Sequence, residues 1–494
     1  MTIKHSLVIT IIYVLITGFH VAASWNQSAP HVVPDEVSYL KQAQYFSGKY
    51  TLQNTKPSIS QESSTANNGT TPGVFEVPYY HFGYSLLVSP IYWLTDTPNV
   101  AHKGVMVFNS FMLSSLFLII FYWIRIITKD INFRTAVTIA LIVSLYPPYI
   151  IHAHIGWAEN AFIPGFALSC LLFTRHLKVG SITTMILFAL IAGFQYTIHP
   201  RGIAVSVTAI LCMAGLFLVR KDKWQLSITG MILVLGIIIA TKIKADEMAI
   251  MMNAVSHSGR ILNNLSSIFE IELITVVIGN LLYLILASLG IFLLGITESI
   301  KQLIDKGSNN LKLLVSDIYT GSLIYTFIAS FLTFCISILF LARKEEWHNA
   351  NGLLDIFLYG RYNEAFLSIY IALGLIWICR TYKQGIQKYS KRLNVAFWFV
   401  AVVSIVSTLL LSDYPYLRSI HTYGIYSWYV LSMIVDKWFG NTPVILGPLI
   451  WTWLVLQLLL QSKSKGLLAV GTYFFLLDLF LISYIIPNFK IFGA

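Results

Sequence analysis

Apolar runs of about twenty residues recur along nearly the whole chain, and they limit the possible folds more than any other feature of the sequence. A helix of about that length crosses the hydrocarbon core of a bilayer. Of the 494 residues, 56% are hydrophobic and only 11% are charged, whereas about 25% of the residues in a soluble domain are charged. The chain is therefore predicted to be an all-α integral membrane protein, residues 1–494 forming a single polytopic membrane domain without a separate soluble domain.

The apolar runs predict a bundle of about thirteen transmembrane helices. Their approximate ranges are 5–24, 104–127, 134–151, 160–177, 181–199, 200–220, 224–242, 271–297, 317–342, 365–380, 393–411, 441–461 and 466–487. If the stretch 423–435 also crosses, the number becomes fourteen. Lys463 and Lys465 would then lie on the outer side, against the charge rule.

Basic residues orient this bundle. The formal net charge is +11, but excess Lys and Arg in a membrane protein marks the inner loops, so it does not indicate nucleic-acid binding. Lys4 and the basic run 380–392 are predicted to lie inside, which makes residues 25–103 one large outer loop and places the C-terminus outside. The four cysteines lie in apolar segments, so neither a disulfide nor a cysteine metal cluster is expected.

The outer loop begins with two adjacent carboxylates, Asp35 and Glu36. Pro34 suits the first position of a helix, the helix dipole favours acidic residues in the first turn, and Gly48 can end the helix. We expect a short amphipathic helix at the membrane surface, although a well-capped surface helix without catalytic function fits the same pattern. A second surface or re-entrant helix is expected after Tyr84, because the apolar segment there is too short to span.

Further polar residues are predicted on the same outer side, and each has a structural alternative. Glu159 beside Trp157 can mark the membrane interface, and His199 with Arg201 can reach lipid phosphate. Arg361 and Glu364 can simply pair with each other. Taken together, however, these residues indicate a reaction site. The planar guanidinium of arginine suits phosphate, and a carboxylate suits the deprotonation of a hydroxyl.

In its Asp35–Glu36 pair, its two loop helices and its span order, the chain resembles the GT-C glycosyltransferase superfamily, especially the protein O-mannosyltransferases and the aminoarabinose lipid A transferase. The resemblance implies a polyprenyl-phosphate sugar donor and a catalytic base in the first outer loop, here Asp35 supported by Glu36. Glu159 matches in position a further acidic residue of the family. Residues 360–364 look like a motif of uncharacterised bacterial members. A C-terminal soluble domain is missing, which leaves a lipid, a glycan or a protein as the acceptor.

The expected activity is that of an inverting hexosyl- or pentosyltransferase of cell-envelope glycan biosynthesis, in a bacterial inner membrane with its site on the outer face. We expect donor phosphate binding by Arg201 and Arg361, with Arg260 and Arg418 as weaker candidates. Candidate substrate-binding residues are Tyr79, His81, Tyr84, His199, Tyr362 and Glu364. No cofactor is required by this scheme, and family members differ on a divalent metal. The alternatives are a transporter or flippase of lipid-linked sugars and a glycan polymerase.

The predicted orientation can be tested by labelling. Single cysteines near Ser64 and near Gln387, in a cysteine-free background, should react with an impermeant reagent from opposite sides of the membrane, because the charge rule separates these two segments. Reaction from the same side would contradict the outer position of Asp35.

Overall fold

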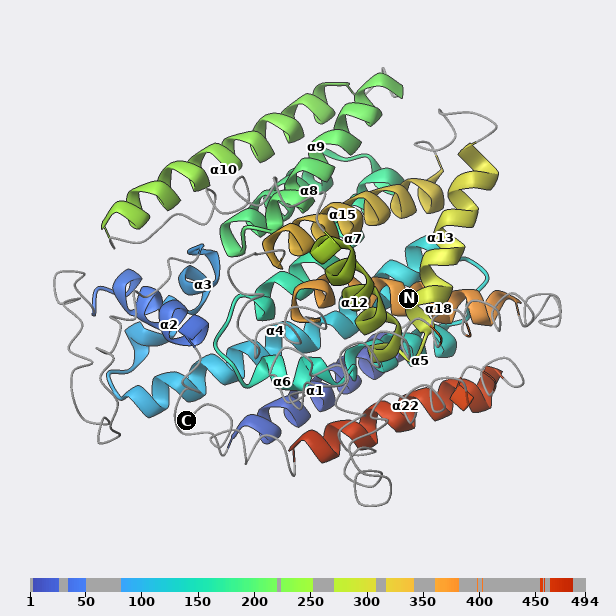
Figure 1. Ribbon diagram of the computed structural model, residues 1–494, viewed down its shortest axis with the longest axis horizontal. Coiled ribbons are helices and arrows are strands. Elements are labelled where there is room, and N and C mark those ends of the chain that lie inside the picture. The colour runs from blue at the N-terminus through green and yellow to red at the C-terminus, as the bar shows by residue number, and fades with distance from the viewer. Residues whose placement is uncertain are drawn as a thin grey trace.

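The computed structural model describes residues 3–25, 34–49, 81–219, 224–251, 271–307, 317–341, 360–381 and 463–482, with a few single residues between 398 and 457. All regular elements in these ranges are helices, as predicted. The predicted spans at 393–411 and 441–461 and the stretch 423–435 lie outside them. Figure 1 shows α1 (Ile3–Ser24), α4 (Pro98–Ile127), α10 (Trp224–Met251) and α22 (Lys463–Phe480) running in similar directions.

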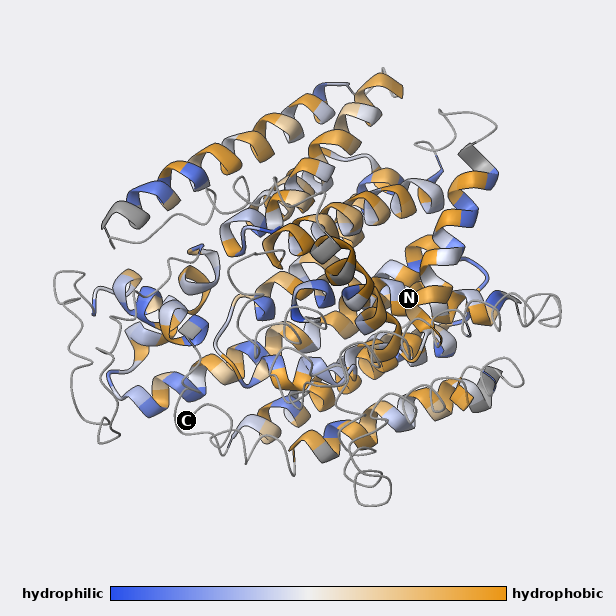
Figure 2. Ribbon diagram, viewed as in Figure 1, coloured by the Kyte–Doolittle hydropathy of each residue, from blue (hydrophilic) through white to orange (hydrophobic). Residues whose placement is uncertain are grey.

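Six helices among the described residues are long and apolar enough to cross a membrane, or seven if one bent pair counts as a span. The six include α1, α4, α9 (Gly202–Val219), α10, α15 (Ile318–Leu341) and the stretch Arg361–Arg380, which contains α18 (Glu364–Thr381). Apolar residues cover most of their length in Figure 2, and hydrophilic residues gather near the ends of α4 and α10. The all-helical membrane fold is therefore confirmed.

The prediction of one straight span over 271–297 is wrong. This stretch forms α12 (Ile271–Ala287) and α13 (Ile291–Gly307), which meet at a bend of 109°. At the bend Leu289 has φ +54° and Gly290 has φ +75°, and the Ser288 hydroxyl accepts a hydrogen bond from the Phe292 N–H at 3.1 Å. A left-handed conformation at two successive residues ends the first helix, and the serine caps the second.

The predicted span 134–151 is also interrupted. Helix α5 (Phe133–Ser144) ends before Pro147, and the short α6 (Pro148–Ala153) follows. Two successive prolines lack the N–H groups that a continuing helix needs, and the residue before a proline is biased away from the helical region. Both breaks place loop backbone and polar side chains inside the bundle.

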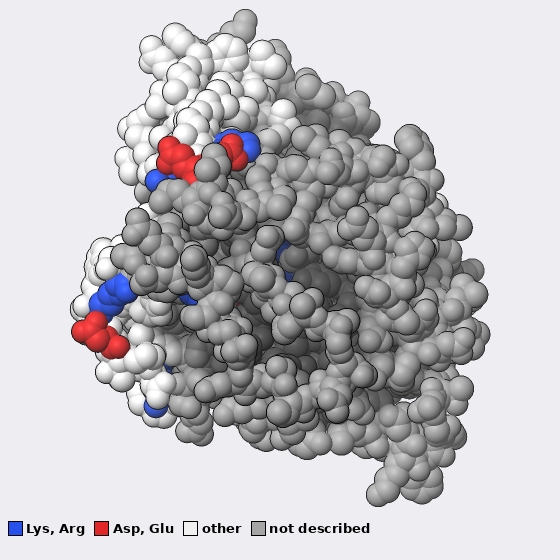
Figure 3. Space-filling view, turned by 60° about the vertical axis from the view of Figure 1, so that its left-hand side comes forward, with Lys and Arg blue, Asp and Glu red and all other residues white. Residues whose placement is uncertain are grey.

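The two short helices expected in the first outer loop are present. Helix α2 (Pro34–Phe46) starts at Pro34, and Gly48 takes φ +75° just after it ends. Helix α3 (Gly83–Leu94) packs against it, since the Ser85 hydroxyl donates to the Tyr39 carbonyl at 2.9 Å. Both lie at one end of the molecule in Figure 1. Figure 3 brings that end forward and shows acidic and basic side chains next to each other on its described surface.

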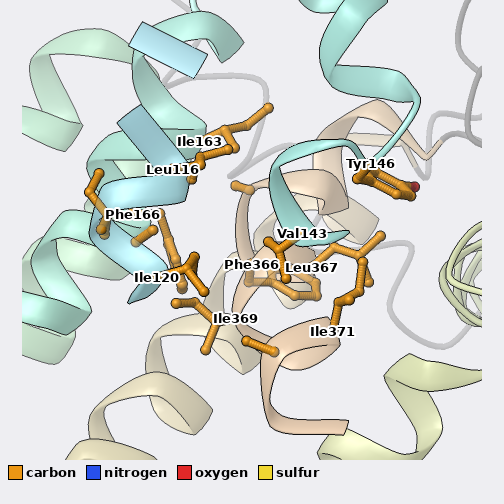
Figure 4. Packing of buried hydrophobic residues seen from close by; sticks show 14 of the residues in the cluster. Leu116, Ile120, Val143, Tyr146, Ile163, Phe166, Phe366, Leu367, Ile369 and Ile371 are labelled. Atoms are coloured by element: carbon orange, nitrogen blue, oxygen red, sulfur yellow. The ribbon is translucent and has the colours of Figure 1, made fainter. Parts of the chain in front are cut away.

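The core forms where α4, α7 (Glu159–Val179) and α18 meet. Leu116 and Ile120 from α4 and Phe166 from α7 are fully buried there (Figure 4). Phe366 and Ile369 approach the same region from α18. The start of α7 and the start of α18 both carry charged residues, so this packing sets the spacing between those charges.

Glycines let α13 and α18 approach closely. A Cβ atom at Gly374 would collide with the Ile291 carbonyl, and one at Gly295 would collide with the Tyr370 carbonyl. Small residues at such contacts allow dense backbone packing in membrane bundles. This contact holds the bent α12–α13 pair against α18.

Candidate active site

Glu159 lies at the centre of the charged residues. It is the first residue of α7 and only 1% of its surface is exposed. Its Oε1 accepts hydrogen bonds from Nε of Arg361 at 2.8 Å and from Nη2 of Arg201 at 3.0 Å. Its Oε2 accepts from Nη2 of Arg361 at 3.1 Å, so Arg361 grips the carboxylate with two nitrogens. One buried carboxylate thus orients both arginines that the sequence singled out.

Asp35 joins this arrangement from α2. Its Oδ2 lies 2.7 Å from Nη2 of Arg361, so this arginine bridges Asp35 and Glu159. We call Asp35, Arg361, Glu159 and Arg201 the charge cluster. Two acids and two arginines alternate in it, which balances the buried charge. The Asp35 side chain is 21% exposed, against 1% for Glu159, so within the cluster Asp35 is the acid that an outside molecule can reach.

Aromatic rings hold the two guanidinium groups in place. Arg361 lies over the Trp157 ring at 3.9 Å from its centroid, and Arg201 lies over the Tyr362 ring at 4.1 Å. Nη1 of Arg201 also donates to the Tyr362 carbonyl. Nδ1 of His199 lies 3.1 Å from Nε of Arg201. His199 and Tyr362, expected to bind substrate, are therefore placed here as neighbours of Arg201.

Glu36 anchors the start of α2. It is fully buried, and its Oε1 accepts the Gly156 N–H at 2.7 Å. A Cβ atom at Gly156 would lie 3.0 Å from the Leu40 side chain and 3.3 Å from Glu36 Oε1, so a larger residue would push α2 away. Because Glu36 holds α2 on the turn that precedes Glu159, it fixes the position of Asp35. Helix α2 is accordingly embedded more deeply than a helix lying on the surface.

In the structure Arg361 does not pair with Glu364, which was the alternative to a functional role for these residues. Residues Arg361–Asn363 form the 3-10 turn η4, so the α-helical spacing between the two side chains does not apply. The Glu364 carboxylate accepts a hydrogen bond from the Tyr283 hydroxyl and forms another hydrogen bond with Nε2 of His152. Neither His152 nor Tyr283, which comes from the bent α12, was predicted as a partner of Glu364.

The remaining candidates lie elsewhere or outside the described residues. Nδ1 of His81 is 2.7 Å from the Tyr196 carbonyl of α8 (Ile182–Ile198), and burial lowers the pKa of His81 to about 4. The Tyr84 hydroxyl donates to Asn109 of α4 at 2.8 Å. These hydrogen bonds go to the helix bundle and not to the charge cluster. Arg260, Arg418 and Tyr79 are not among the described residues.

The described part of the chain contains no preformed metal site. No group of three His, Cys, Asp or Glu side chains there has the geometry to hold an ion. The chemistry that the charge cluster offers is that of two arginines for an anion and one reachable carboxylate for a proton.

The sequence matches no known protein family and no curated protein. The structure, however, is similar to that of ArnT from Cupriavidus metallidurans bound to undecaprenyl phosphate, with a TM-score of 0.51, 11% sequence identity, and coverage of 98% of this chain and 77% of that chain. The same protein in the apo state gives a TM-score of 0.46 with 11% identity and the same coverage. The chain has the fold of ArnT. That fold is the one the sequence resemblance predicted.

The charge of Glu159 makes a testable contribution to stability. Burial alone would raise its pKa, but Arg361 and Arg201 outweigh burial and lower the pKa from 4.5 to about 2. A depressed pKa in the folded state stabilises the protein above the ordinary value, and this stabilisation is lost as the pH falls through the folded-state value. The melting temperature of the purified protein, followed by tryptophan fluorescence, should therefore fall more steeply between about pH 5 and pH 3 in wild type than in Glu159→Gln.

Glu247→Gln provides the matched control. Glu247 pairs with Lys244 on α10, and its side chain is 56% exposed, so its removal should leave the pH dependence unchanged. Parallel curves for wild type and Glu159→Gln would show that the Glu159 carboxylate is not held ionised by the arginines.

Proposed function

We propose that the chain is an integral-membrane glycosyltransferase that moves one sugar from a polyprenyl-phosphate donor to an acceptor hydroxyl on the outer face of a bacterial inner membrane. The observation that carries this proposal is the charge cluster, in which the partly exposed Asp35 lies 2.7 Å from Arg361 while buried Glu159 holds both arginines. Phosphate binding and proton removal are thus provided side by side.

The two arginines suit the donor phosphate. Guanidinium groups suit phosphate because they carry a permanent positive charge and donate hydrogen bonds from a planar fork. Because Glu159 and the rings of Trp157 and Tyr362 already fix them, little side-chain freedom is lost when an anion binds. The same positive charge stabilises the phosphate as it leaves, so no acid is needed.

Asp35 is placed to act as the general base. It lies in the first turn of α2 and is the partly exposed acid of the charge cluster. In the proposed reaction Asp35 takes the proton of the acceptor hydroxyl, and the acceptor oxygen attacks the anomeric carbon. The bond from that carbon to the phosphate oxygen breaks and its electron pair stays on the polyprenyl phosphate. Direct displacement inverts the anomeric carbon, and no cofactor is required.

Two further observations support the lipid donor. ArnT, whose fold the chain shares, is bound to undecaprenyl phosphate in the similar structure. The charge cluster is also built at the starts of α2 and α7, in the turn before α9 and in η4, next to apolar helices that can lie in lipid. A donor with a lipid tail and an acceptor from water can therefore approach the same carboxylate.

The bent α12–α13 pair favours one other function, transport of a lipid-linked sugar. Transporters often place their sites at broken helices near the middle of the membrane. Here the bend lies at residues 288–290, whereas the charge cluster is built from α2, α7, the turn before α9 and η4. The experiments on Asp35 separate the two functions.

The substitution Asp35→Asn tests whether Asp35 is the general base. The substitution keeps the shape of the side chain and removes its basicity, so donor binding should survive while turnover falls by about 10²–10⁴-fold. The measurement is transfer of radiolabelled sugar from the polyprenyl-phosphate donor by the purified protein. Asp96→Asn, at a side chain 93% exposed and paired with Lys49, is the control and should retain full turnover.

Turnover of Asp35→Asn within about threefold of wild type would exclude general-base catalysis by this residue, which is typically worth far more. Transport of the lipid-linked sugar across vesicles by a protein that shows no transfer would favour the transporter.

Arg361→Ala tests the phosphate contact. Loss of charge-assisted hydrogen bonds should weaken donor binding by about 1.5–3 kcal/mol, and Arg361→Lys should restore it only in part because lysine keeps the charge but loses the fork. Arg380→Ala is the control on the same helix, since Arg380 pairs with Asp130 at 3.1 Å near the other end of α18. Unchanged donor affinity in Arg361→Ala, measured by titration in nanodiscs, would limit Arg361 to holding Asp35 and Glu159 in place.

A further inference from the structure

A second buried polar cluster lies beside the charge cluster, around Glu364. Its carboxylate is hydrogen-bonded to the Tyr283 hydroxyl and to His152, and all three residues are nearly inaccessible to solvent. We call the following set the Glu364 cluster: Tyr146, Tyr149, His152, Tyr283, Glu364 and Ser368. The turn between α5 and α6, the bent α12 and the start of α18 contribute its members.

Four polar atoms of this cluster make no hydrogen bond of ordinary geometry to a described residue, although Tyr146 has Tyr283 and Tyr149 has Ser368 as a polar neighbour. They are the hydroxyls of Tyr146, Tyr149 and Ser368 and Nδ1 of His152. Each of these side chains is at most 1% exposed. Buried polar atoms nearly always have a partner, so several such atoms in one place point to a polar ligand.

Packing holds the members of the cluster in place. The Tyr146 and Tyr149 rings meet edge to face at 5.1 Å. A side chain at Gly360 would collide with the Tyr283 ring, so the backbone just before Arg361 lies directly against it. Polar groups on such well-packed rings are fixed in direction, which suits selection of one ligand geometry.

The cluster is linked to Arg361 through Trp157. The Trp157 ring lies 3.9 Å from the Arg361 guanidinium and 5.1 Å from the His152 ring. Arg361 and Glu364 are also only three residues apart in η4 and α18. A ligand with an anionic group at Arg361 would therefore extend its neighbouring part toward Glu364.

We propose that the Glu364 cluster binds the hydroxyl groups of the donor sugar, and this inference rests on the proposed glycosyltransferase function. Tyrosine and serine hydroxyls and an imidazole nitrogen can each donate to or accept from a sugar hydroxyl. The tyrosine and tryptophan rings provide the apolar surface on which a sugar ring packs. The cluster determines which sugar is transferred, while the charge cluster holds the phosphate.

The chemistry favours a neutral sugar over a cation. The carboxylate that the described cluster contains already has two partners in Tyr283 and His152. The atoms left to meet a ligand are uncharged hydroxyls and an imidazole nitrogen. Such a set matches several hydroxyl groups better than it matches an ammonium group or a metal ion.

The test compares lipids with and without a sugar. The full-length protein in nanodiscs is titrated with undecaprenyl phosphate and with undecaprenyl phosphate carrying a neutral hexose, a neutral pentose or an amino sugar. At least one neutral sugar-bearing lipid should bind wild type about tenfold more tightly than the bare lipid. Tyr149→Phe and the milder Ser368→Ala should each reduce this difference by about threefold or more and leave binding of the bare lipid unchanged. Reductions of this size are those of single lost hydrogen bonds.

Tyr325→Phe is the matched control. Tyr325 is fully buried, its hydroxyl has no partner among the described residues, and it packs on Phe173 and Phe188. It should not change the preference for a sugar-bearing lipid.

Each outcome decides the inference. Equal binding of bare and sugar-bearing lipids by wild type, or an unchanged preference in both Tyr149→Phe and Ser368→Ala, would overturn it while leaving a phosphate site. A preference confined to the amino sugar would overturn the neutral class. Failure of the bare lipid itself to bind wild type would refute the proposed lipid donor, which distinguishes the two proposals.

Discussion

The structure depends on one buried carboxylate between two buried guanidinium groups. Glu159 pairs with both Arg201 and Arg361, and an uncompensated charge inside the bundle would be strongly destabilising. The three residues come from α7, the turn before α9 and η4, so their pairing draws distant parts of the chain to one point. Asp35 then completes the charge balance from α2, and Glu36 secures that helix through the Gly156 N–H.

Breaks in the helices make this arrangement possible. Straight spans would place their polar residues at the two membrane surfaces, far from the bundle axis. The break before α6 turns His152 inward, and the bend between α12 and α13 fits Tyr283 against Gly360. Irregular backbone at this depth is tolerated where protein surrounds it, and here capping by Ser288 satisfies one of the freed N–H groups. His152 and Tyr283 thus reach Glu364 from two interrupted segments.

Much of the fold could be predicted from local pattern, whereas the pairings of the site could not. Hydropathy located spans such as α4, α10 and α15, and Pro34, the acidic first turn and Gly48 located α2, because these signals act within a few residues. The partners of Arg361 could not be predicted, since Glu159 is 202 residues away in the chain. Local spacing instead favoured Glu364, and the 3-10 turn removes that contact. The bend at Leu289 was also hidden, because a leucine in a left-handed conformation leaves no mark in an apolar run.

Charge balance explains why a base and a phosphate site would share one arginine. In the proposed reaction the donor phosphodiester carries one negative charge, and the departing phosphate gains a second. Asp35 loses its negative charge at the same time, because it receives the proton of the acceptor. The total charge that faces Arg361 and Arg201 is therefore the same before and after transfer. Buried charges are costly to change but cheap to move over short distances within a fixed environment, so the guanidinium groups held by Glu159 need not reorganise. If the carboxylate did not share its arginine with the phosphate, the charge of the cluster would be unbalanced either before or after transfer.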